Sequence, residues 1–192
     1  MLKINAMTAG FILAATAAMA EPQTYQLDTS HSQIMFSYDH LGFSTTMGMF
    51  SDITGTIVFD PEDPAASSVE ASFPIASLMT GYADRDAHFL SADFFGSEAA
   101  APEVTFKSTS IEVTGEDTAL ISGDLTLNGV TREVVLDTVL NGRGDHPMMN
   151  RPWIGFDATT TVLRSDFNLG MFAPAVSDEV EIRISVEAMQ PE

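Results

Sequence analysis

Apolar and polar residues alternate along most of the chain, and this period of two is the feature that most constrains its fold. The alternating stretches are separated by Gly, Asn, Asp and Pro. Alternation is typical of strands that bury one face, and the separating residues favour tight turns. We therefore predict strands over residues 25–28, 32–39, 46–59, 68–75, 103–113, 118–127, 130–141, 154–164 and 179–189.

The turns between these segments indicate an antiparallel topology. Asn128 and Gly129 lie between two alternating runs and favour the type I′ turn of a tight hairpin. Asn141 and Gly142 mark the next strand end. Short turns between most segments predict an all-β fold, a single closed antiparallel β-barrel of about eight strands. A two-sheet sandwich is the structural alternative.

One stretch, from Tyr82 to Phe95, departs from the alternation. Its apolar residues recur at near-helical spacing, and a charged cluster over residues 84–86 lies on the other side. Ser91 is a candidate N-cap for a second short turn that carries Phe94 and Phe95. We predict a short helical insertion that closes one end of the barrel as an aromatic plug.

One face of each predicted strand collects apolar residues, and these should line a single interior. Small residues share the same inward register. An eight-stranded barrel is wide enough either to be filled by large side chains or to hold one small ligand. The small residues favour a cavity, and filling by Phe, Met and the helical insertion is the alternative. The apolar positions are Ile34, Phe36, Tyr38, Met47, Met49, Ile53, Ile57, Phe59, Val104, Phe106, Ile121, Leu125, Val134, Leu136, Ile154, Phe156, Ile182 and Ile184, and the small ones are Ser51, Gly55, Ala71, Ser108, Ala119, Gly123 and Ala158.

The composition narrows the classes of ligand and partner. The chain has 11 Met and 13 Phe residues, whose flexible and flat side chains suit a hydrocarbon ligand. Its formal net charge of −19 argues against nucleic acid and anionic membrane surfaces as partners. Because no Cys is present, stability has to come from burial and from the hydrogen bonds of the sheet.

Residues 1–20 have the features of a cleavable secretory signal peptide. Lys3 supplies a positive charge, an apolar run follows from Ala6 to Ala18, and residues 18–20 form an A-x-A cleavage signal. The run is shorter than the roughly 20 residues that a membrane span needs. We therefore expect one mature domain over residues 21–192, located in a bacterial periplasm.

Several motifs taken together resemble one known family. They are Tyr25-x-Leu27-Asp28-x-x-His31-Ser32, His40-Leu41-Gly42, Phe59-Asp60-Pro61, Arg85-Asp86-x-His88-Phe89-x-Ser91-x-Asp93-Phe94-Phe95, Pro102-x-Val104-Thr105-Phe106, Leu125-Thr126-Leu127-x-Gly129-Val130-Thr131, Arg164-Ser165-Asp166-Phe167 and Val176-Ser177-Asp178-x-Val180-x-Ile182. They follow one another in the family's order from about residue 25 to 188. With these motifs the chain resembles the YceI-like family of periplasmic polyisoprenoid-binding proteins.

The resemblance implies a lipocalin-like eight-stranded barrel whose pore holds a polyisoprenoid lipid, such as a prenyl quinone. It implies a carrier rather than an enzyme, no cofactor other than the bound lipid, a homodimer and a membrane cytochrome partner. Ligand contacts are expected where pattern and resemblance both point inward, on the helical insertion, and at the mouth near Trp153. For Trp153, packing on the exposed surface is the alternative. The expected ligand-binding residues are Phe36, Met49, Leu78, His88, Phe89, Phe94, Phe95, Phe106, Ile121, Leu125, Leu136, Trp153 and Phe156.

The polar residues form no motif for catalysis or for metal binding. The four His residues lack the spacing of known zinc sites, and no nucleophile motif is present. We expect Asp28, His31 and Ser32 to fix the start of a strand through side chain–backbone hydrogen bonds. We expect Arg85 and Arg164 to form ion pairs with nearby Asp residues.

Two other functions are alternatives at this point. One is an enzyme that acts on the same lipid or on a small apolar substrate, with His88 and Asp86 as acid and base. The other is an electron-transfer partner whose acidic surface docks a basic redox protein. A contact from Arg85 or His88 to a ligand head group is the alternative to ion pairing.

Overall fold

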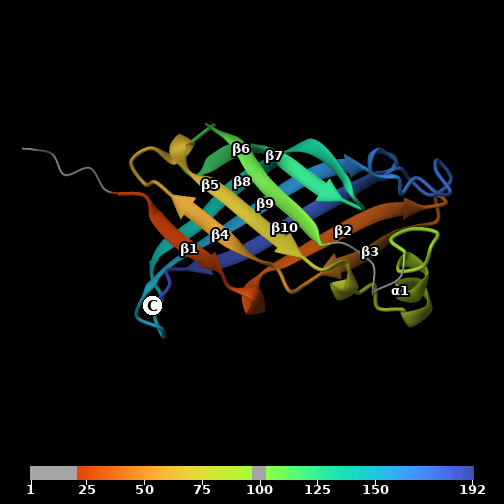
Figure 1. The fold of residues 1–192 in the computed structure, drawn as a ribbon, viewed down its shortest axis with the longest axis horizontal. Coiled ribbons are helices and arrows are strands. Elements are labelled where there is room, and N and C mark those ends of the chain that lie inside the picture. The colour runs from red at the N-terminus through yellow and green to blue at the C-terminus, as the bar shows by residue number, and fades with distance from the viewer. Residues whose placement is uncertain (1–20, 97–102) are drawn as a thin grey trace, which may run out of the picture.

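The computed structural model describes residues 21–96 and 103–192, and its regular structure is mostly β (Figure 1). One α-helix, α1 (Ala83–Phe89), is followed by a turn over residues 91–95, which confirms the predicted helical insertion. The 3-10 helices are η1 (Thr29–His31), η2 (Pro64–Ala66), η3 (Ile75–Ser77) and η4 (Arg164–Phe167). The strands are β1 (Gln23–Leu27), β2 (Gln33–His40), β3 (Ser44–Phe50), β4 (Thr54–Phe59), β5 (Ser68–Phe73), β6 (Val104–Val113), β7 (Thr118–Leu127), β8 (Val130–Asp145), β9 (Pro152–Leu163) and β10 (Glu179–Met189).

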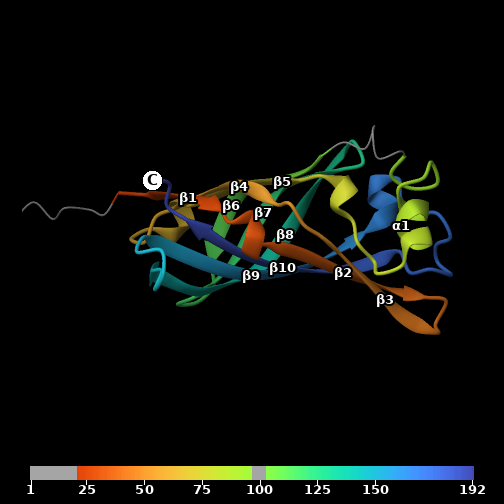
Figure 2. The ribbon, with the colours of Figure 1, turned by 90° about the horizontal axis from the view of Figure 1, so that it is seen from below.

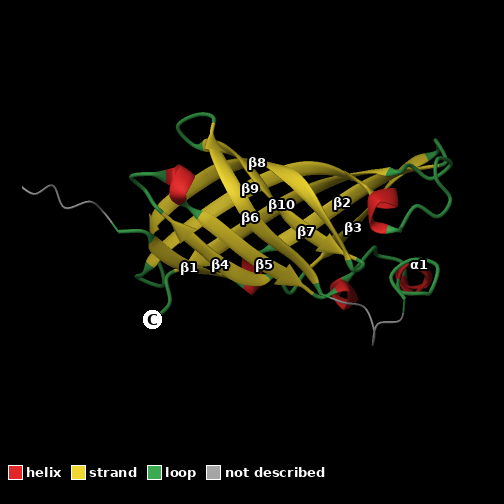
Figure 3. Ribbon diagram, turned by 45° about the horizontal axis from the view of Figure 1, so that its top comes forward, coloured by secondary structure: helices red, strands yellow, loops and turns green. Residues whose placement is uncertain are grey.

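Eight of the strands form a closed antiparallel barrel, as the sequence predicts. Their hydrogen-bonded order is β1-β4-β5-β6-β7-β8-β9-β10, and β1 pairs with β10 to close the ring. Figure 3 shows these strands crossing the long axis of the barrel obliquely, which is the tilt that closure requires. β2 and β3 continue the sheet beyond β10 as a hairpin that extends away from the barrel wall (Figure 2).

One edge of β10 holds both β1 and β2. Leu27 of β1 pairs with Ala188, near the end of β10, whereas β2 pairs with residues 181–185. β1 and β2 therefore occupy a single strand position that η1 interrupts. In the same way, β3 and β4 follow one another beside them, separated by residues 51–53.

The strand predicted over residues 46–59 is in fact two strands, and the break changes which side chains face inward. Asp52 has a φ of 58°, a left-handed conformation that interrupts regular pairing. The alternation shifts by one residue across the break. Phe50 lines the interior, whereas Met47 and Met49 do not. The inward prediction for these two methionines is therefore wrong, and Met47 is 67% exposed.

The strand connections define two ends of the barrel. The β2–β3, β7–β8 and β9–β10 connections lie at the end that carries α1, here called the α1 end (Figure 1). The β4–β5, β6–β7 and β8–β9 connections lie at the opposite end, which carries η2 and is here called the η2 end. In the described ranges, no helix has the length and apolar character that crossing a membrane requires.

Buried side chains form two separate clusters. The larger one contains Tyr25, Ile57 and Ile154 and lies towards the η2 end. The smaller one contains Phe167 and Leu169 and lies at the α1 end. The middle of the barrel lies between two packed regions, and its contents decide whether the interior is solid or hollow.

Side-chain hydrogen bonds fix η1 between β1 and β2, as the sequence predicts. Asp28 Oδ1 accepts from the Ser30 backbone N–H at 3.0 Å, and Asp28 Oδ2 lies 2.7 Å from His31 Nδ1. The hydrogen bond to Asp28 raises the pKa of His31, and the charges of Asp28 and Glu187 raise it further. Burial alone would raise the pKa of Asp28, but the hydrogen bonds from Ser30 and His31 together hold it below its usual value.

These two shifts predict a pH-dependent contribution of His31 to stability. Protonated His31 stabilises the fold at acidic pH, and this stabilisation is lost as the pH rises through the raised pKa of His31. The pair persists in acid until the pH falls through the lowered pKa of Asp28. His31→Gln should therefore lower the Tm most at about pH 5.5 and little above about pH 8.5, as measured by circular dichroism during heating.

A second variant, which lacks the carboxylate of Asp28, tests the contact between His31 and Asp28. In an Asp28→Asn background, the effect of His31→Gln on the Tm should depend much less on pH, because only the weaker effect of Glu187 remains. An equal loss of Tm at acidic and alkaline pH in the wild-type background would contradict a stabilising pair.

Candidate functional site

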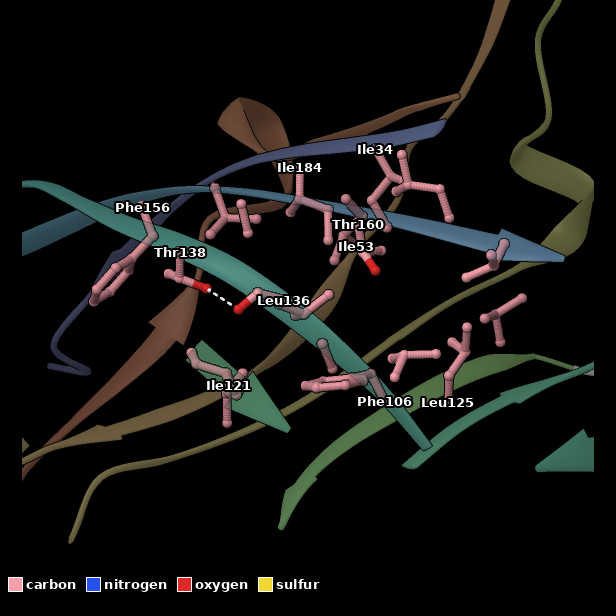
Figure 4. Close-up of a pocket in the computed structure, with 18 of the residues that line it drawn as sticks. Ile34, Ile53, Phe106, Ile121, Leu125, Leu136, Thr138, Phe156, Thr160 and Ile184 are labelled. Carbon is pink, nitrogen blue, oxygen red and sulfur yellow. Dashed lines mark hydrogen bonds between the residues drawn. The ribbon is translucent and has the colours of Figure 1, made fainter. Parts of the chain in front are cut away.

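A cavity with a volume of about 690 Å³ occupies the interior of the barrel. Side chains from all ten strands line it, together with α1 and the loops of the α1 end. In Figure 4, Phe106, Leu136 and Ile184 project into one common space from different strands. Ligand pockets typically have volumes of about 300–1,000 Å³, so the cavity is large enough to hold a ligand. The choice between a filled core and a cavity is thereby decided in favour of the cavity.

Alternation along each strand produces the apolar lining. In β10, Ile182 and Ile184 line the cavity, whereas the intervening Arg183 is exposed on the outer face. The barrel therefore presents one surface of Ile, Leu, Val and Phe to its interior and a polar surface to solvent.

Small residues that are predicted to face inward have two different roles in the cavity wall. Ala71, Ala119 and Ala158 line the cavity and widen it. Gly123 instead makes room for an aromatic ring, because a Cβ atom at this position would lie 2.4 Å from Cζ of Phe106. A small residue in the wall thus leaves empty space only where no neighbouring ring covers it.

Most of the predicted ligand-binding residues lie around this cavity. They come from β2, β6, β7, β8 and β9, from the segment that leads into α1, and from α1 and its following turn. The residues that line the cavity are Phe36, Leu78, His88, Phe89, Phe94, Phe95, Phe106, Ile121, Leu125, Leu136 and Phe156.

The other two predicted positions, Met49 and Trp153, lie outside the lining. Met49 follows the shifted alternation of β3. Trp153 is on the outer face of β9, since Phe156 of the same strand faces inward. Its Nε1 donates to Glu187 Oε2 at 2.7 Å, and its ring centroid lies 4.6 Å from that of His146. The expectation that Trp153 caps the mouth is therefore wrong.

The methionines make no contribution to the cavity wall over the described residues. Several are on the surface instead: Met148 is 84% exposed and Met79 is 52% exposed. The expectation of a Met-rich wall is wrong. Branched and aromatic side chains have fewer rotatable bonds than Met, so they give the cavity a more defined shape.

Sequence reasoning missed lining residues whose position depends on an irregularity. Phe50 ends β3, just before the break at Asp52. Arg143 lines the η2 end because a bulge in β8 between Leu140 and Gly142 shifts the alternation by one residue. The periodic pattern of the sequence does not predict either shift, although Gly142 interrupts the alternation.

The helical insertion closes the α1 end as an aromatic plug. The ring centroid of Phe89 lies 6.4 Å from that of Phe36 and 6.2 Å from that of Tyr38, and both contacts are edge-to-face. Phe94 lies 5.3 Å from Phe89 and 6.4 Å from Phe172. The plug therefore packs against the inner face of β2 on one side and against the β9–β10 loop on the other, as predicted.

The two arginines at this end do not form the predicted ion pairs with residues that the structure describes. Arg85 donates to Thr80. Arg164 donates to four backbone carbonyls of the β9–β10 loop at 2.5 to 2.9 Å, and burial lowers its pKa against the opposing effect of Asp178. The carbonyl oxygens belong to Leu169, Met171, Val176 and Ser177.

The proposed acid–base pair of the enzyme alternative is not assembled. Asp86 Oδ1 accepts a hydrogen bond from the Thr80 backbone N–H at 2.8 Å, whereas His88 Nε2 lies 3.1 Å from Asp93 Oδ2. Each of the two side chains is therefore engaged with a different partner. In this structure, Asp86 and His88 do not act as a pair.

A group of metal-ligating side chains lies outside the barrel. Ligand atoms of Asp28, His31 and Glu187 are within 4.8 Å of one another. Asp28 and His31 bond each other at η1, and Glu187 accepts from Trp153. The Asp28–His31 contact fixes η1, and the Glu187–Trp153 bond links β10 to β9, which gives the three side chains a structural role.

Comparison with known proteins assigns the chain to one protein family. A model of the YceI-like domain family matches residues 25–188. The chain belongs to the YceI-like family. Protein YceI of Escherichia coli O17:K52:H18 is 39% identical over 182 residues, covering 95% of this chain and 94% of the relative.

Solved structures with the same barrel are known. The crystal structure of the Campylobacter jejuni YceI protein has a TM-score of 0.70 at 30% identity, covering 80% of this chain and 90% of that one. A polyisoprenoid binding domain from Saccharophagus degradans, implicated in plant cell wall breakdown, has a TM-score of 0.62 at 17% identity, covering 87% of this chain and 98% of that one. The second likeness concerns the fold alone.

The carbonyl contacts of Arg164 predict that it holds the β9–β10 loop in place. Arg164→Lys should destabilise the protein by about 2 kcal/mol, because an ammonium group cannot reproduce the planar fork of donors. Urea unfolding measures the loss, and amide exchange should rise over residues 168–178. Arg183→Lys, on the outer face of β10, is the matched control. Equal stability of the two variants would show that the carbonyl contacts contribute nothing.

Proposed function

We propose that this YceI-like protein binds a polyisoprenoid lipid and sequesters its hydrocarbon chain inside the barrel. The apolar cavity, enclosed by a closed sheet and by the plug, is the observation that carries the proposal. The binding properties stated for the Saccharophagus degradans domain, which has the same fold, agree with it.

The energetics favour recognition of a long chain. Transfer of each methylene group from water into the cavity contributes about 0.8 kcal/mol. Binding also costs several kcal/mol of lost translational and rotational freedom. A chain of a few isoprene units therefore gains enough to bind without many polar contacts, which fits a wall made mainly of Ile, Leu, Val and Phe.

Sequestration requires no chemical step, and we infer that the protein is a carrier and not an enzyme. The polyisoprenoid binding domain from Saccharophagus degradans, which has the same fold, and the separate engagement of Asp86 and His88 support this inference. A prenyl quinone is one candidate ligand. The homodimer and the membrane cytochrome partner implied by the family resemblance stay predictions.

The cavity predicts that binding depends on space in the middle of the barrel. Ala158→Phe adds a ring to the cavity wall, whereas Thr159→Phe adds the same ring to the exposed outer face of β9. Organic extraction and mass spectrometry of the wild-type protein and of Thr159→Phe should release a prenyl lipid. Ala158→Phe should retain less than about a tenth as much, since the added ring obstructs the path of a long chain through the middle of the cavity.

The stability of Ala158→Phe shows whether the variant has lost only its lipid or has also lost its fold. Because the added ring of Ala158→Phe fills space that is empty without ligand, the variant should unfold cooperatively in denaturant. If the wild-type protein carries no lipid and takes up no added prenyl chain, the proposed function is wrong.

We also propose that the protein is exported to the periplasm. The predicted signal segment, residues 1–20, lies outside the described residues. Expression of the full chain in a Gram-negative host should yield a periplasmic species whose intact mass corresponds to residues 21–192. Replacing Ala18 and Ala20 with bulky residues should block processing, and a mature species that retains residues 1–20 in the wild type would contradict the prediction.

A further inference from the structure

The charged residues and histidines that line the cavity are all basic at the α1 end and of mixed sign at the η2 end. The chain has a formal net charge of −19. Nevertheless, every charged residue or histidine in the described cavity wall at the α1 end is basic. Acidic side chains line the cavity at the η2 end only. The α1-end residues are His40, Arg85, His88 and Arg164, and the η2-end residues are Glu116, Asp117 and Arg143.

Two of these basic groups are already engaged. Arg164 is saturated by backbone carbonyls of the β9–β10 loop. His88 lies beside the carboxylate of Asp93, which offsets any positive charge on its ring. Neither group is therefore the main attraction for a negative charge at this end of the cavity.

Arg85 is held differently. Its Nε donates to Thr80 Oγ1 at 2.9 Å, and its Nη2 donates to the Thr80 carbonyl at 2.8 Å. These bonds use two of the five N–H donors of a guanidinium. Among the residues that the structure describes, no carboxylate lies within 4.0 Å of Arg85. The neighbouring Asp86 bonds Thr80 instead, so it helps to orient the guanidinium through Thr80.

The surroundings of Arg85 strengthen its interaction with an anion. The side chain is half-buried and lines the cavity beside the aromatic plug. Electrostatic interactions are stronger next to apolar walls than in water. The planar fork of a guanidinium also matches the paired oxygens of a phosphate or a carboxylate.

We propose that the bound lipid has a fixed direction, with an anionic head group held by Arg85 at the α1 end and its chain directed towards the η2 end. The head group carries the oxygens of a phosphate or a carboxylate. This inference rests on the proposed lipid-binding function and names the class of ligand. At the η2 end, Glu116 and Asp117 would repel the same head group and outnumber Arg143, so the opposite direction is less favourable.

Three ligands of equal chain length test the head group: a polyprenyl phosphate, the corresponding polyprenoic acid and the neutral polyprenol. Affinities are measured by displacement of a fluorescent apolar probe from the cavity. The wild-type protein should bind the two anions about tenfold more tightly than the alcohol. Preference for only one of the anions supports the proposal and identifies the head group.

Variants of Arg85 assign the preference to this residue. Arg85→Gln should lose most of the preference for the two anions over the polyprenol. Arg85→Lys should keep part of the preference, since it retains the charge but loses the fork. Arg183→Gln, which removes the same charge from the outer face of β10, should behave as the wild type does. Cooperative unfolding in urea serves as the check that each variant is folded.

The outcomes separate the two proposals. Equal wild-type affinity for all three ligands overturns the head-group proposal and leaves lipid binding in place. An anion preference that survives in Arg85→Gln overturns the assignment to Arg85. Failure of every ligand to bind overturns the proposed function itself.

Photo-crosslinking tests the direction independently. A polyprenyl phosphate that carries a diazirine next to its phosphate should label peptides from residues 82–95 or 164–178 at the α1 end. Labelling confined to residues 115–118, at the η2 end, would overturn the proposed direction even if the anion preference is observed.

Discussion

The pairing of β10 with both β1 and β2 along one edge is the constraint on which the rest of the structure depends. The contact with β1 closes a ring of eight strands, and the number of strands in a closed ring sets the width of its interior. The contact with β2 directs the β2–β3 hairpin out of the ring, so that its inner face can receive the aromatic plug. η1 makes both contacts compatible, because it absorbs the bend between the two strands.

The barrel is hollow even though its wall contains many large side chains. Where the sequence offers a glycine, as at Gly123, a neighbouring Phe106 ring occupies the place of the missing side chain. The ring of strands is fixed by backbone hydrogen bonds, so the wall cannot collapse inward to fill the remaining space. Lining atoms of an empty cavity lack contacts on one side. A hydrocarbon chain supplies those contacts, and its binding stabilises the folded state in proportion to its affinity.

The α1 end combines closure with polarity. Phe89 and Phe94 seal the interior by edge-to-face contacts, while Arg164 holds the neighbouring loop through its carbonyls. Acidic side chains of this end, including Asp86 and Asp93, bond to Thr80 and His88 and do not line the cavity. The acidic side chains of this end are thereby kept apart from the basic part of the cavity wall. The two ends of the barrel therefore differ in chemical character.

The sequence alone determines the fold class, most strand positions and most of the cavity wall, because alternation fixes which face of a strand is buried. It also places the plug, since Tyr82 to Phe95 interrupts the alternation. Tertiary structure alone decides three matters. The left-handed residue Asp52 moves Met49 outward and Phe50 inward. The alternation of β9 turns Trp153 towards Glu187 on the outer face. Arg85 and Arg164 bond to Thr80 and to backbone carbonyls instead of to nearby Asp residues. These outcomes depend on local shifts of register and on which polar atoms folding brings within reach, and a periodic pattern contains neither.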